Sequence, residues 1–512
     1  MASEFQVIGQ NTAALFTLKA HRGDGMVLLG MNWKNGNPPD NFVGFSIEYK
    51  EPDGNRFYAL KNRISFSDTI DSNNPNRLST LRSPIQKFRW VHFPRNANLP
   101  GEFTYKISPV FMNDLDELSY GESQIVNIEL NRKTYPNKLN IAYTRGFVSS
   151  QAFVDHYESA GKINTLLPSK AINGLKFTPT HPKKNEALTW MGFEAHEVIL
   201  EVLDKGIEDK TAEVRVIAYD LNEPEIVKRL EKLGKRLMII IDNDGAHGKA
   251  GSAENQAEKK LKISAGKENV KRQHMSKLQH NKMIVVNGTK IKVAICGSTN
   301  FSWRGLYVQS NNVLALYGKN TIKPFLTAFQ NYWDFNSASA FSKTTSADWS
   351  NLGLNNINAK VSFSPHSNTN ALLNTIADDV EKRTTSSLLY SLAFLFQTPG
   401  VIKESIKKVT SNKKIFVYGI SDKKVGGIVL QKPDGNEVPV YASALSKNLP
   451  QPFKSEPSGG GGIRMHHKFI VIDFDKPTAR VYLGSYNFSD PADTKNGENL
   501  LLIRNRKIAS HI

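Results

Sequence analysis

The pattern of hydrophobic and polar positions changes near residue 131. Before that point, apolar and polar residues alternate in short aromatic and β-branched runs, which turns containing Pro, Gly or Asn separate. The runs are FVGFSIEYK (42–50), FRWVHF (88–93), EFTYKISPVF (102–111) and SQIVNIEL (123–130). Alternation with a period of two places one face of each strand in a core. We therefore predict that residues 1–131 form a small antiparallel β-sandwich.

Beyond about residue 140, helical patterns alternate with short apolar runs. EAHEVILEVLDKGI (194–207) and PEIVKRLEKLGKR (224–236) have the periodicity of helices, whereas VRVIAYD (214–220) and RLMIIID (236–242) are typical of buried strands. This alternation predicts an α/β fold with a largely parallel or mixed sheet.

The α/β region contains an internal repeat. QHNKMIVVN (279–287) matches MHHKFIVID (465–473), and CGSTNFS (296–302) matches LGSYNFS (483–489). KFTPTH is paired with VSFSPHS in the same way, so that Phe177 would correspond to Phe363 at the offset of 186 residues that separates His280 from His466.

Two copies of one α/β unit predict a pseudo-twofold fold with a site at the seam. The halves are expected to cover residues 140–335 and 359–512, and the polar stretch between about 335 and 358 would connect them. In each copy a histidine and a lysine stand two residues apart at the start of a strand. Alternate strand residues share a face, so each pair aims an imidazole and an ammonium group at one spot.

These motifs carry a family resemblance. HxK, then Asp five residues after the lysine, then GSxN, present twice, resembles the HKD signature of the phospholipase D superfamily. The first copy has Asn287 where the aspartate is expected, and the second copy has Asp473. The resemblance covers roughly residues 140–512. It implies two pseudo-symmetric phospholipase D-like α/β/α halves after the β-sandwich, and metal-independent phosphodiester cleavage through a phosphohistidine.

The chemistry explains why these residue types are present. Cleavage of a phosphodiester needs a nucleophile, a proton donor for the leaving oxygen and groups that stabilise charge on the phosphoryl oxygens. His280 and His466 can share the first two tasks. The expected donors to the phosphoryl oxygens are Lys282, Lys468, Asn300 and Asn487, with Ser298 and Ser485 as weaker candidates. The sequence has no cluster with the usual zinc or calcium spacing, so we expect no metal and no cofactor.

The two halves are unequal. The second half has Asp473 and Glu498, where the first half has Asn287 and Asn311. A carboxylate beside an imidazole raises the pKa of that imidazole, whereas a neutral amide does so much less. We therefore expect His466 to be the general acid and His280 the nucleophile. Asn287 fits equally well as the first residue of an Asn-Gly turn.

Composition limits the partners. The formal net charge of +18 favours an anionic partner such as nucleic acid, a phospholipid surface or a phosphorylated small molecule. The single Cys296 excludes an intrachain disulfide, and neither a signal-peptide pattern nor an apolar run of about 18 residues is recognisable. We therefore expect a cytoplasmic protein without an integral membrane segment.

Two segments precede the HxK strands and are candidates for substrate binding. One is the lysine-rich stretch 248–279, and the other is PSGGGG (457–462), followed by Arg464. The basic residues are expected to contact phosphates of a polyanion, and the glycine-rich loop is expected to move over the bound substrate. A solvated, partly disordered insertion with scattered charge is the alternative. Trp303 either stacks on a base or packs in the core.

These features favour nucleic acid over phospholipid, so the first hypothesis is a nuclease that binds and cleaves DNA or RNA. The alternatives are a phospholipase D or transphosphatidylase acting on phospholipid head groups, and a binding or scaffold protein whose catalytic pair has decayed. Both HxK motifs lie in one chain, so a monomer is sufficient for one active site.

Overall fold

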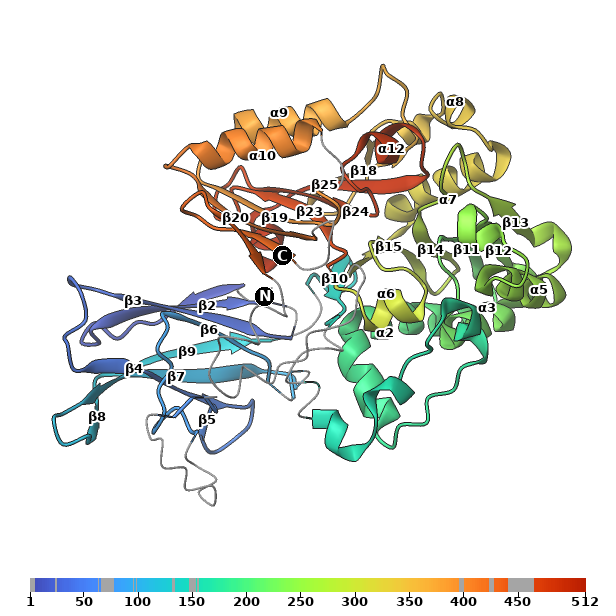
Figure 1. The fold of residues 1–512 in the computed structure, drawn as a ribbon. Helices are drawn as coiled ribbons and strands as arrows, with labels where there is room; N and C mark the ends of the chain where they lie inside the picture. Colours follow the sequence, from blue (N-terminus) through green and yellow to red (C-terminus); the bar gives the residue numbers. More distant parts are fainter. Residues whose placement is uncertain are drawn as a thin grey trace. The chain divides into compact units, whose positions relative to one another are not determined.

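The computed structural model describes residues 5–23, 25–62, 64–65, 78–94, 96–97, 99–130, 134–146, 153, 156–395, 400–422, 428–440 and 465–512. These residues form two compact units (Figure 1). One contains residues 1–134 with 510–512, and the other contains residues 135–509. The predicted fold class, α/β preceded by a small β-sandwich, is confirmed.

The N-terminal unit is a sandwich of two antiparallel sheets. Its core contains Phe16 and Leu29 from one sheet and Phe45, Phe103 and Tyr105 from the other, all fully buried. One sheet has the order β1 (Gln6–Ile8), β2 (Phe16–Arg22), β3 (Val27–Trp33), β6 (Arg89–His92). The other has the order β5 (Tyr58–Ala59), β4 (Phe42–Lys50), β7 (Glu102–Met112), β8 (Leu118–Tyr120), and β9 (Gln124–Glu129) also pairs with β7. The four predicted strands correspond to β4, β6, β7 and β9.

The larger unit contains two mixed sheets. The first has the order β10 (Leu139–Tyr143), β16 (Asn312–Tyr317), β15 (Lys292–Gly297), β14 (Lys282–Asn287), β11 (Glu213–Ala218), β12 (Leu237–Asp242), β13 (Val270–Gln273). The second has the order β17 (Ser350–Asn351), β18 (Asn358–Ser364), β25 (Glu498–Arg504), β24 (Arg480–Gly484), β23 (Lys468–Ile472), β19 (Ser387–Leu392), β20 (Phe416–Asp422), β21 (Ile428–Gln431), β22 (Glu437–Val440).

The two sheets repeat one topology. From β10 to β12 and from β18 to β20, the neighbouring pairs have the same sequence of antiparallel and parallel directions. The repeat ends there, because β13 is parallel to β12 whereas β21 is antiparallel to β20. The strands that follow the two HxK histidines, β14 and β23, occupy equivalent central positions.

One predicted correspondence is wrong. Phe363 lies on β18, whose equivalent in the first sheet is β10 and not the segment around Phe177. Phe177 follows a short 3₁₀ helix and packs edge-on against Trp303. The match of KFTPTH to VSFSPHS is therefore not a structural repeat.

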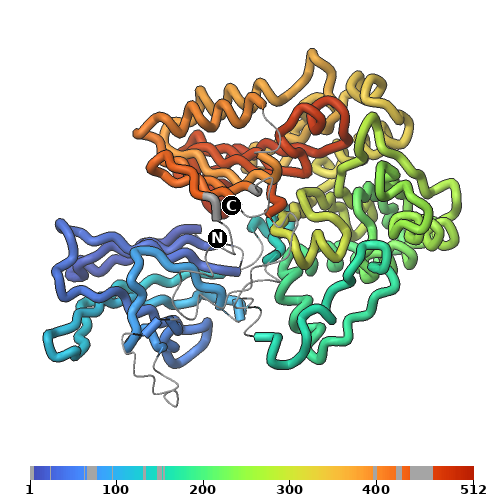
Figure 2. The backbone as a smooth tube through the Cα atoms, in the orientation of Figure 1, coloured from blue at the N-terminus to red at the C-terminus, as the bar shows by residue number. Residues whose placement is uncertain are grey.

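Amphipathic helices cover the sheets. Apolar residues of α2, α3 and α5 pack on the first sheet, and those of α9 and α10 pack on the second. Figures 1 and 2 show α9 and α10 side by side along one face of the second sheet, where Ile376 and Ile406 are buried. The main helices are α2 (Lys184–Glu208), α3 (Pro224–Leu233), α5 (Ala253–Ala265), α7 (Lys319–Asp334), α9 (Leu373–Arg383) and α10 (Val401–Ser411).

Local sequence accounts for several helix starts. The Glu223 side chain accepts a hydrogen bond from the backbone N–H of Ile226, and Pro224 occupies the first turn of α3. Ser252 caps α5 and Ser302 caps α6 (Trp303–Tyr307) in the same way. The short helices are α4 (Gly245–Gly248), α6 (Trp303–Tyr307), α8 (Ala338–Phe341), α12 (Asp490–Thr494), α13 (Arg506–His511), η1 (Glu158–Ala160), η2 (Ile163–Thr165), η3 (Ala171–Lys176), η4 (Gly234–Arg236), η5 (Lys267–Asn269) and η6 (Thr345–Ala347).

The stretch predicted to connect the halves contains α8, η6 and β17, so it is structured. The lysine-rich stretch 248–279 is likewise not an irregular insertion, because α5, η5 and β13 occupy most of it. In the described part of the chain, no helix is long and apolar enough to cross a membrane.

Candidate functional site

The two HxK segments meet at the seam between the sheets. His280 and His466 each lie two residues before the first residue of a central strand, and both are buried. In each segment the lysine Nζ donates a hydrogen bond to the backbone oxygen of the histidine two residues before it, His280 or His466. Lys468 acts electrostatically on His280, and Lys282 acts on His466, so each lysine lies near the histidine of the other half.

Each half contributes backbone contacts to the other. An isolated bridge joins Gln279 to Gly497, and its counterpart joins Ser310 to Met465. The backbone N–H of His466 donates to Ser310 O at 3.1 Å. The predicted pseudo-twofold seam therefore has a direct structural basis beside both histidines.

The polar partners of the histidines are exchanged between the halves. His280 Nδ1 lies 2.8 Å from Glu498 Oε2, and His466 Nδ1 lies 2.8 Å from Asn311 Oδ1. This corrects the expectation that Glu498 supports the histidine of its own half. The carboxylate is paired with His280, and the amide with His466.

The surrounding hydrogen bonds fix the tautomers. Asn311 Nδ2 donates to Gly305 O, so Asn311 Oδ1 faces His466 and accepts its Nδ1–H. Glu498 Oε2 accepts from Ser485 Oγ at 2.7 Å and, in the same way, from His280 Nδ1–H. Each imidazole therefore retains Nε2 as the nitrogen available for chemistry.

Ser298 and Ser485 hold these partners and are not free to bind substrate. Ser298 Oγ donates to Asn311 Oδ1 at 2.9 Å and accepts from the backbone N–H of Asn312. Ser485 Oγ donates to Glu498 and accepts from the backbone N–H of Asn499 at 3.0 Å. The predicted role of both hydroxyls as phosphate ligands is corrected, because their protons are already committed.

The glycines of GSxN are required by the backbone. Gly297 has a φ of 127°, and a Cβ there would lie 2.6 Å from Asn312 O. Gly484 has a φ of 155°, and its Cβ would lie 2.2 Å from Asn499 O. The two loops can therefore approach the neighbouring strand only with glycine at these positions.

Asn300 and Asn487, the last residues of the GSxN loops, carry polar groups without partners. The Oδ1 atoms of both side chains are buried and have no hydrogen-bond partner among the described residues. A buried amide is normally satisfied, so these two side chains are poised to bind a group that enters the site.

Burial and nearby charge set the protonation of the site. Burial lowers the pKa of both histidines well below the usual value, and Lys282 and Lys468 lower it further. Burial also lowers the pKa of Lys282 to about 8, although Glu498 opposes this shift. It raises the pKa of Glu498 to about 8, against the attraction of Lys282. The site is therefore a desolvated cluster built to receive an anion.

Asp473 does not contact the site, which corrects its predicted role. It lies beyond the far end of β23, where its carboxylate accepts backbone N–H bonds from Thr385, Ser386 and Ser387. Asn287 is likewise the last residue of β14, roughly 20 Å from His280 for an extended strand of this length. Neither residue can bind a phosphate held between the histidines.

Trp303 belongs to the core. Its Nε1 donates to Gly174 O at 3.0 Å, and its ring packs against Phe177 and Tyr307. The alternative of stacking on a base is therefore wrong for this position. Arg464 and the PSGGGG loop lie outside the described residues.

Several basic side chains of the lysine-rich stretch already contact other groups of the protein. Arg272 Nη1 donates to Glu258 at 2.9 Å, and Lys271 Nζ donates to Trp333 O at 2.5 Å. Lys262 pairs with Glu258 and Lys260 with Glu231. These four cations do not form the free basic rim that the sequence predicted.

Sequence reasoning missed a second polar cluster beside His280. It contains Tyr219, Asp220, Asp242, His247 and Glu254. Asp220 follows β11, and Asp242 is the last residue of the neighbouring parallel strand β12. Because functional groups gather at the carboxyl ends of parallel strands, VRVIAYD and RLMIIID carried a signal for this cluster.

Ligand atoms of Asp220, His247 and Glu254 lie within 4.8 Å of one another, a spacing that fits a metal. However, both His247 nitrogens lie against carboxylates, with Nε2 3.0 Å from Asp220 and Nδ1 2.8 Å from Asp242. Burial opposes the charge on His247, but these hydrogen bonds raise its pKa to about 10. An imidazolium has no lone pair for a metal, so we interpret the cluster as an ionic network.

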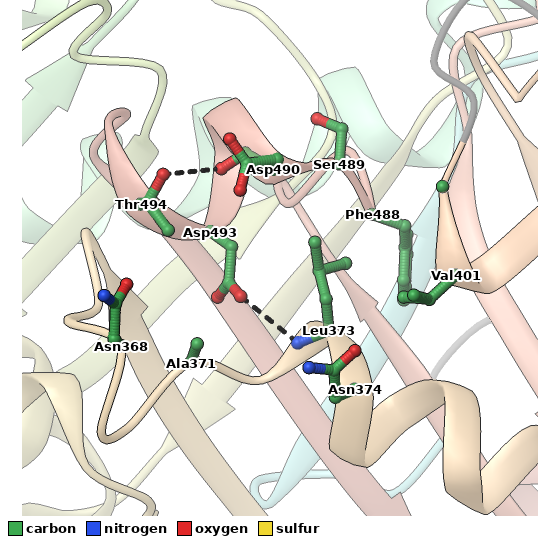
Figure 3. Close-up of a pocket in the computed structure, with 11 residues that line it drawn as sticks. Asn368, Ala371, Leu373, Asn374, Val401, Phe488, Ser489, Asp490, Asp493 and Thr494 are labelled. Atoms are coloured by element: carbon green, nitrogen blue, oxygen red, sulfur yellow. Dashed lines mark hydrogen bonds between the residues drawn. The ribbon is translucent and has the colours of Figure 1, made fainter.

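A surface pocket of about 410 Å³ is lined by Phe488, the residue directly after Asn487, but by no residue of either HxK motif. Figure 3 shows Asp493 directed at the start of α9, where it accepts from the backbone N–H of Leu373. His366 Nδ1 lies 2.7 Å from the same carboxylate. We therefore interpret Asp493 as a structural residue that holds the start of α9 and the His366 side chain.

Comparison with known proteins agrees with the geometry. The family model described as cardiolipin synthase, PLD-like domain, matches residues 204–333 and 402–512, which include both HxK motifs. These two segments belong to the phospholipase D superfamily. This membership supports an enzyme that acts on phosphodiesters, by hydrolysis or by group transfer. Comparison with curated proteins gives no match.

Solved structures of the phospholipase D superfamily are distant from this chain. Polyphosphate kinase from Porphyromonas gingivalis is 10% identical, over 61% of this chain and 43% of its own, with a TM-score of 0.38. Phosphatidylserine synthase from Haemophilus influenzae is 12% identical, over 60% and 82%, with a TM-score of 0.41. Nuc from Salmonella typhimurium is 24% identical, over 27% and 87%, with a TM-score of 0.22. The chain thus spans less than half of the polyphosphate kinase.

Proposed function

We propose that this phospholipase D-like protein is a metal-independent phosphodiesterase in which His280 attacks phosphorus and His466 serves as general acid and then general base. The observation that supports the proposal is the crossed pairing of the histidines. Glu498 accepts from His280 Nδ1, whereas Asn311 accepts from His466 Nδ1.

The pairing distinguishes the two roles. A nucleophilic imidazole becomes positively charged as its Nε2 bonds to phosphorus, and a carboxylate at Nδ1 stabilises that charge. A general acid must release its proton readily, and a neutral amide at Nδ1 does not hold the imidazolium as strongly. His280 therefore suits nucleophilic attack, and His466 suits proton transfer. The expected roles are kept, but for a reason different from the one that the sequence suggested.

The reaction has two steps. In the first, the Nε2 lone pair of neutral His280 forms a bond to phosphorus while the bond to the leaving oxygen breaks. His466 enters this step as the imidazolium, a form that the bound phosphodiester anion favours, and its Nε2–H protonates the leaving oxygen. In the second, His466 removes a proton from water, the hydroxide attacks phosphorus, and the bond to His280 breaks. The products are an alcohol and a phosphomonoester, and both histidines return to their starting protonation states.

The remaining polar groups are placed to stabilise charge on the phosphoryl oxygens. Lys282 and Lys468 are buried beside the histidines, and their charge compensates the anionic phosphodiester. Asn300 and Asn487 contribute amide groups that have unfilled hydrogen-bonding capacity. We propose that these four side chains bind the non-bridging oxygens.

For the substrate we favour nucleic acid, which makes the protein a nuclease. The formal net charge of +18 supports a polyanionic partner. The second candidate is phospholipid, because the matching family model carries the description cardiolipin synthase. The two candidates share the same phosphodiester chemistry and differ in what surrounds the phosphate.

The experiment is an activity assay in EDTA. Wild type, His280→Ala, His466→Ala and the control His274→Ala, in which an exposed histidine of the same half is removed, are tested on single- and double-stranded DNA and RNA. The same proteins are tested on phosphatidylcholine and phosphatidylglycerol vesicles.

Cleavage of nucleic acid that both active-site variants lose and the control retains supports the nuclease. Head-group release alone favours the phospholipase. Activity that requires added metal contradicts the mechanism, and inactivity on every substrate favours the binding or scaffold protein.

A further inference from the structure

His247 bridges two carboxylates beside the first HxK segment. It lies on the short helix α4, after β12, with Nε2 3.0 Å from Asp220 Oδ1 and Nδ1 2.8 Å from Asp242 Oδ2. Its side chain is only 14% exposed. Because carboxylates only accept hydrogen bonds, both ring nitrogens carry protons and His247 is a cation.

Gln279 and Tyr219 connect this bridge to His280. Asp242 Oδ1 accepts the backbone N–H of Gln279, the residue directly before His280, at 2.7 Å. The Tyr219 ring lies between the two imidazoles, with its centroid 4.6 Å from that of His247 and 4.6 Å from that of His280. The Lys282 ammonium lies 4.7 Å from the centre of the same ring.

Asp220 extends the bridge to the GSxN loop of the first half. Its Oδ2 accepts from Ser302 Oγ at 3.2 Å, and Ser302 caps α6 directly after this loop. The His247 imidazolium thus holds two carboxylates and packs against Tyr219. Asp242 fixes the backbone directly before His280, Asp220 fixes the end of the GSxN loop, and Tyr219 packs against the His280 ring.

The second half is built differently at the equivalent positions. Ala218 pairs with Lys282 in the first sheet, and Leu392 pairs with Lys468 in the second. The residues that follow, Tyr219 and Asp220, therefore correspond to Ala393 and Phe394. The Phe394 ring lies edge-on to His466 with a centroid separation of 6.2 Å. A carboxylate stands near one histidine where an apolar ring stands near the other.

We propose that His247 is a positioning residue for His280, acting through Asp220, Asp242 and Tyr219 to orient this nucleophile and to balance the negative charge beside it. The inference deepens the proposed function and rests on it. His247 itself touches no reacting atom. Its role is specific to the step in which His280 attacks phosphorus.

The charges predict a distinctive effect of pH. Asp220, Asp242 and Glu254 face His247, while Lys282, Lys468, Asp220, Asp242 and Glu498 act on His280. Asp220 and Asp242 favour the protonated form of His280, and the His247 cation offsets them. Removal of that cation leaves the carboxylates uncompensated, so the pKa of His280 rises. Because His280 attacks in its neutral form, the acidic limb of the rate profile then moves to higher pH.

The test uses bis(4-nitrophenyl) phosphate and the full-length protein. Attack by His280 releases one equivalent of 4-nitrophenolate per site, so the burst rate constant reports the first step. Wild type, His247→Gln, Asp220→Asn and the double variant Asp220→Asn/His247→Gln are compared between pH 5 and pH 9. His274→Gln is the matched control, because this exposed histidine precedes the same HxK segment. Thermal melting monitors the fold of every variant.

We expect His247→Gln to lower the maximal burst rate constant by about 10-fold to 100-fold, since small displacements of a nucleophile have effects of this size. The concentration of bis(4-nitrophenyl) phosphate that gives the half-maximal burst rate should stay within about twofold of the wild-type value. This is expected for a residue that orients the nucleophile and does not bind substrate. The acidic limb should move to higher pH in His247→Gln and return toward the wild-type position in the double variant. Asp220→Asn tests the bridge even if His247→Gln does not fold.

A wild-type burst that His247→Gln and Asp220→Asn both retain, with an unmoved acidic limb, overturns the inference alone. Loss of the burst without a shift of the limb, and without recovery in the double variant, also overturns it, because a merely structural role gives this result. Absence of a burst in wild type overturns the proposed function and this inference together.

Discussion

Glu498 Oε2 lies 2.8 Å from His280 Nδ1, although the two are 218 positions apart. Glu498 is the first residue of β25 in the second sheet, and His280 lies two residues before β14 in the first. The equivalent contact, from Asn311 to His466, has the same length. The active-site histidines therefore depend on each other's half of the molecule for their partner. His280 faces a carboxyl group that can carry a negative charge, whereas His466 faces a neutral amide, and this difference makes the two histidines chemically distinct.

Replacing Glu498 with glutamine should slow the first step. The amide still accepts from His280 Nδ1, but it lacks the charge that stabilises the imidazolium formed on attack. We expect the burst rate constant on bis(4-nitrophenyl) phosphate to fall about 100-fold, as for other preorganised groups that stabilise a transition state. A change of less than about threefold would show that the carboxylate does not support the nucleophile.

The converse variant, Asn311→Asp, gives His466 a carboxylate partner. A negative charge at Nδ1 raises the pKa of His466, so the general acid stays protonated to higher pH. The basic limb of kcat/KM on an alkyl phosphodiester should therefore move to higher pH, while the acidic limb stays in place. A shift of the acidic limb instead would assign the nucleophile to His466.

The leaving group distinguishes acid from nucleophile directly. Departure of 4-nitrophenolate needs little protonation, whereas departure of an alkoxide requires it. His466→Ala should therefore release close to one equivalent of 4-nitrophenolate and accumulate phosphohistidine on His280, yet be inactive on an alkyl diester. His280→Ala should show no burst on either substrate. Mass spectrometry after rapid quenching locates the phosphoryl group, and phosphate on His466 in wild type would reverse the assignment.

The sequence predicted the residues of the site better than their contacts. Period-two alternation and the repeat were sufficient to place His280, Lys282, His466 and Lys468 at two strand entries. The crossed pairing could not be predicted, because the sequence does not tell whether the Glu498 side chain turns toward its own half or across the seam. Because Glu498 belongs to the same half as His466, the sequence favoured a contact between these two residues. In the structure Glu498 contacts His280 instead.

Asp473 was assigned wrongly for a simpler geometric reason. Five strand residues separate it from His466, and about 3.3 Å per residue places it at the other end of β23. Residues at one end of a strand meet those at the same end of neighbouring strands. That rule also points to Asp220, just after β11, and to Asp242, at the end of β12, which the motifs alone did not indicate.

Asp473→Asn should therefore lower stability without affecting catalysis. Hydrogen bonds from Thr385 Oγ1 and from three backbone N–H groups hold the pKa of Asp473 below its usual value, although burial acts in the opposite direction. Losing the charge should reduce the free energy of unfolding by about 2–3 kcal/mol at pH 7.

Because the folded-state pKa of Asp473 is lowered, the stabilisation is present above the unfolded-state pKa and is lost as the pH falls through the folded value. The difference between Asp473→Asn and wild type in urea unfolding should thus shrink in acid. An unchanged unfolding midpoint together with a loss of the 4-nitrophenolate burst would return Asp473 to the active site.

Trp303 provides the last test, between core packing and base stacking. The residue is only 6% exposed, and its Nε1–H donates to Gly174 O. Trp303→Ala should therefore lower the free energy of unfolding by about 3–5 kcal/mol. Trp303→Phe keeps most of the apolar contact and should cost less, while leaving the affinity for single-stranded DNA within about twofold of wild type.

Stacking on a base is worth about 1–3 kcal/mol, so a base-stacking role predicts a clear loss of affinity in Trp303→Ala even under conditions where the variant is fully folded. Fluorescence anisotropy with a labelled oligonucleotide, measured beside urea unfolding, separates the two roles. Weaker DNA binding by a folded variant would place Trp303 on the substrate.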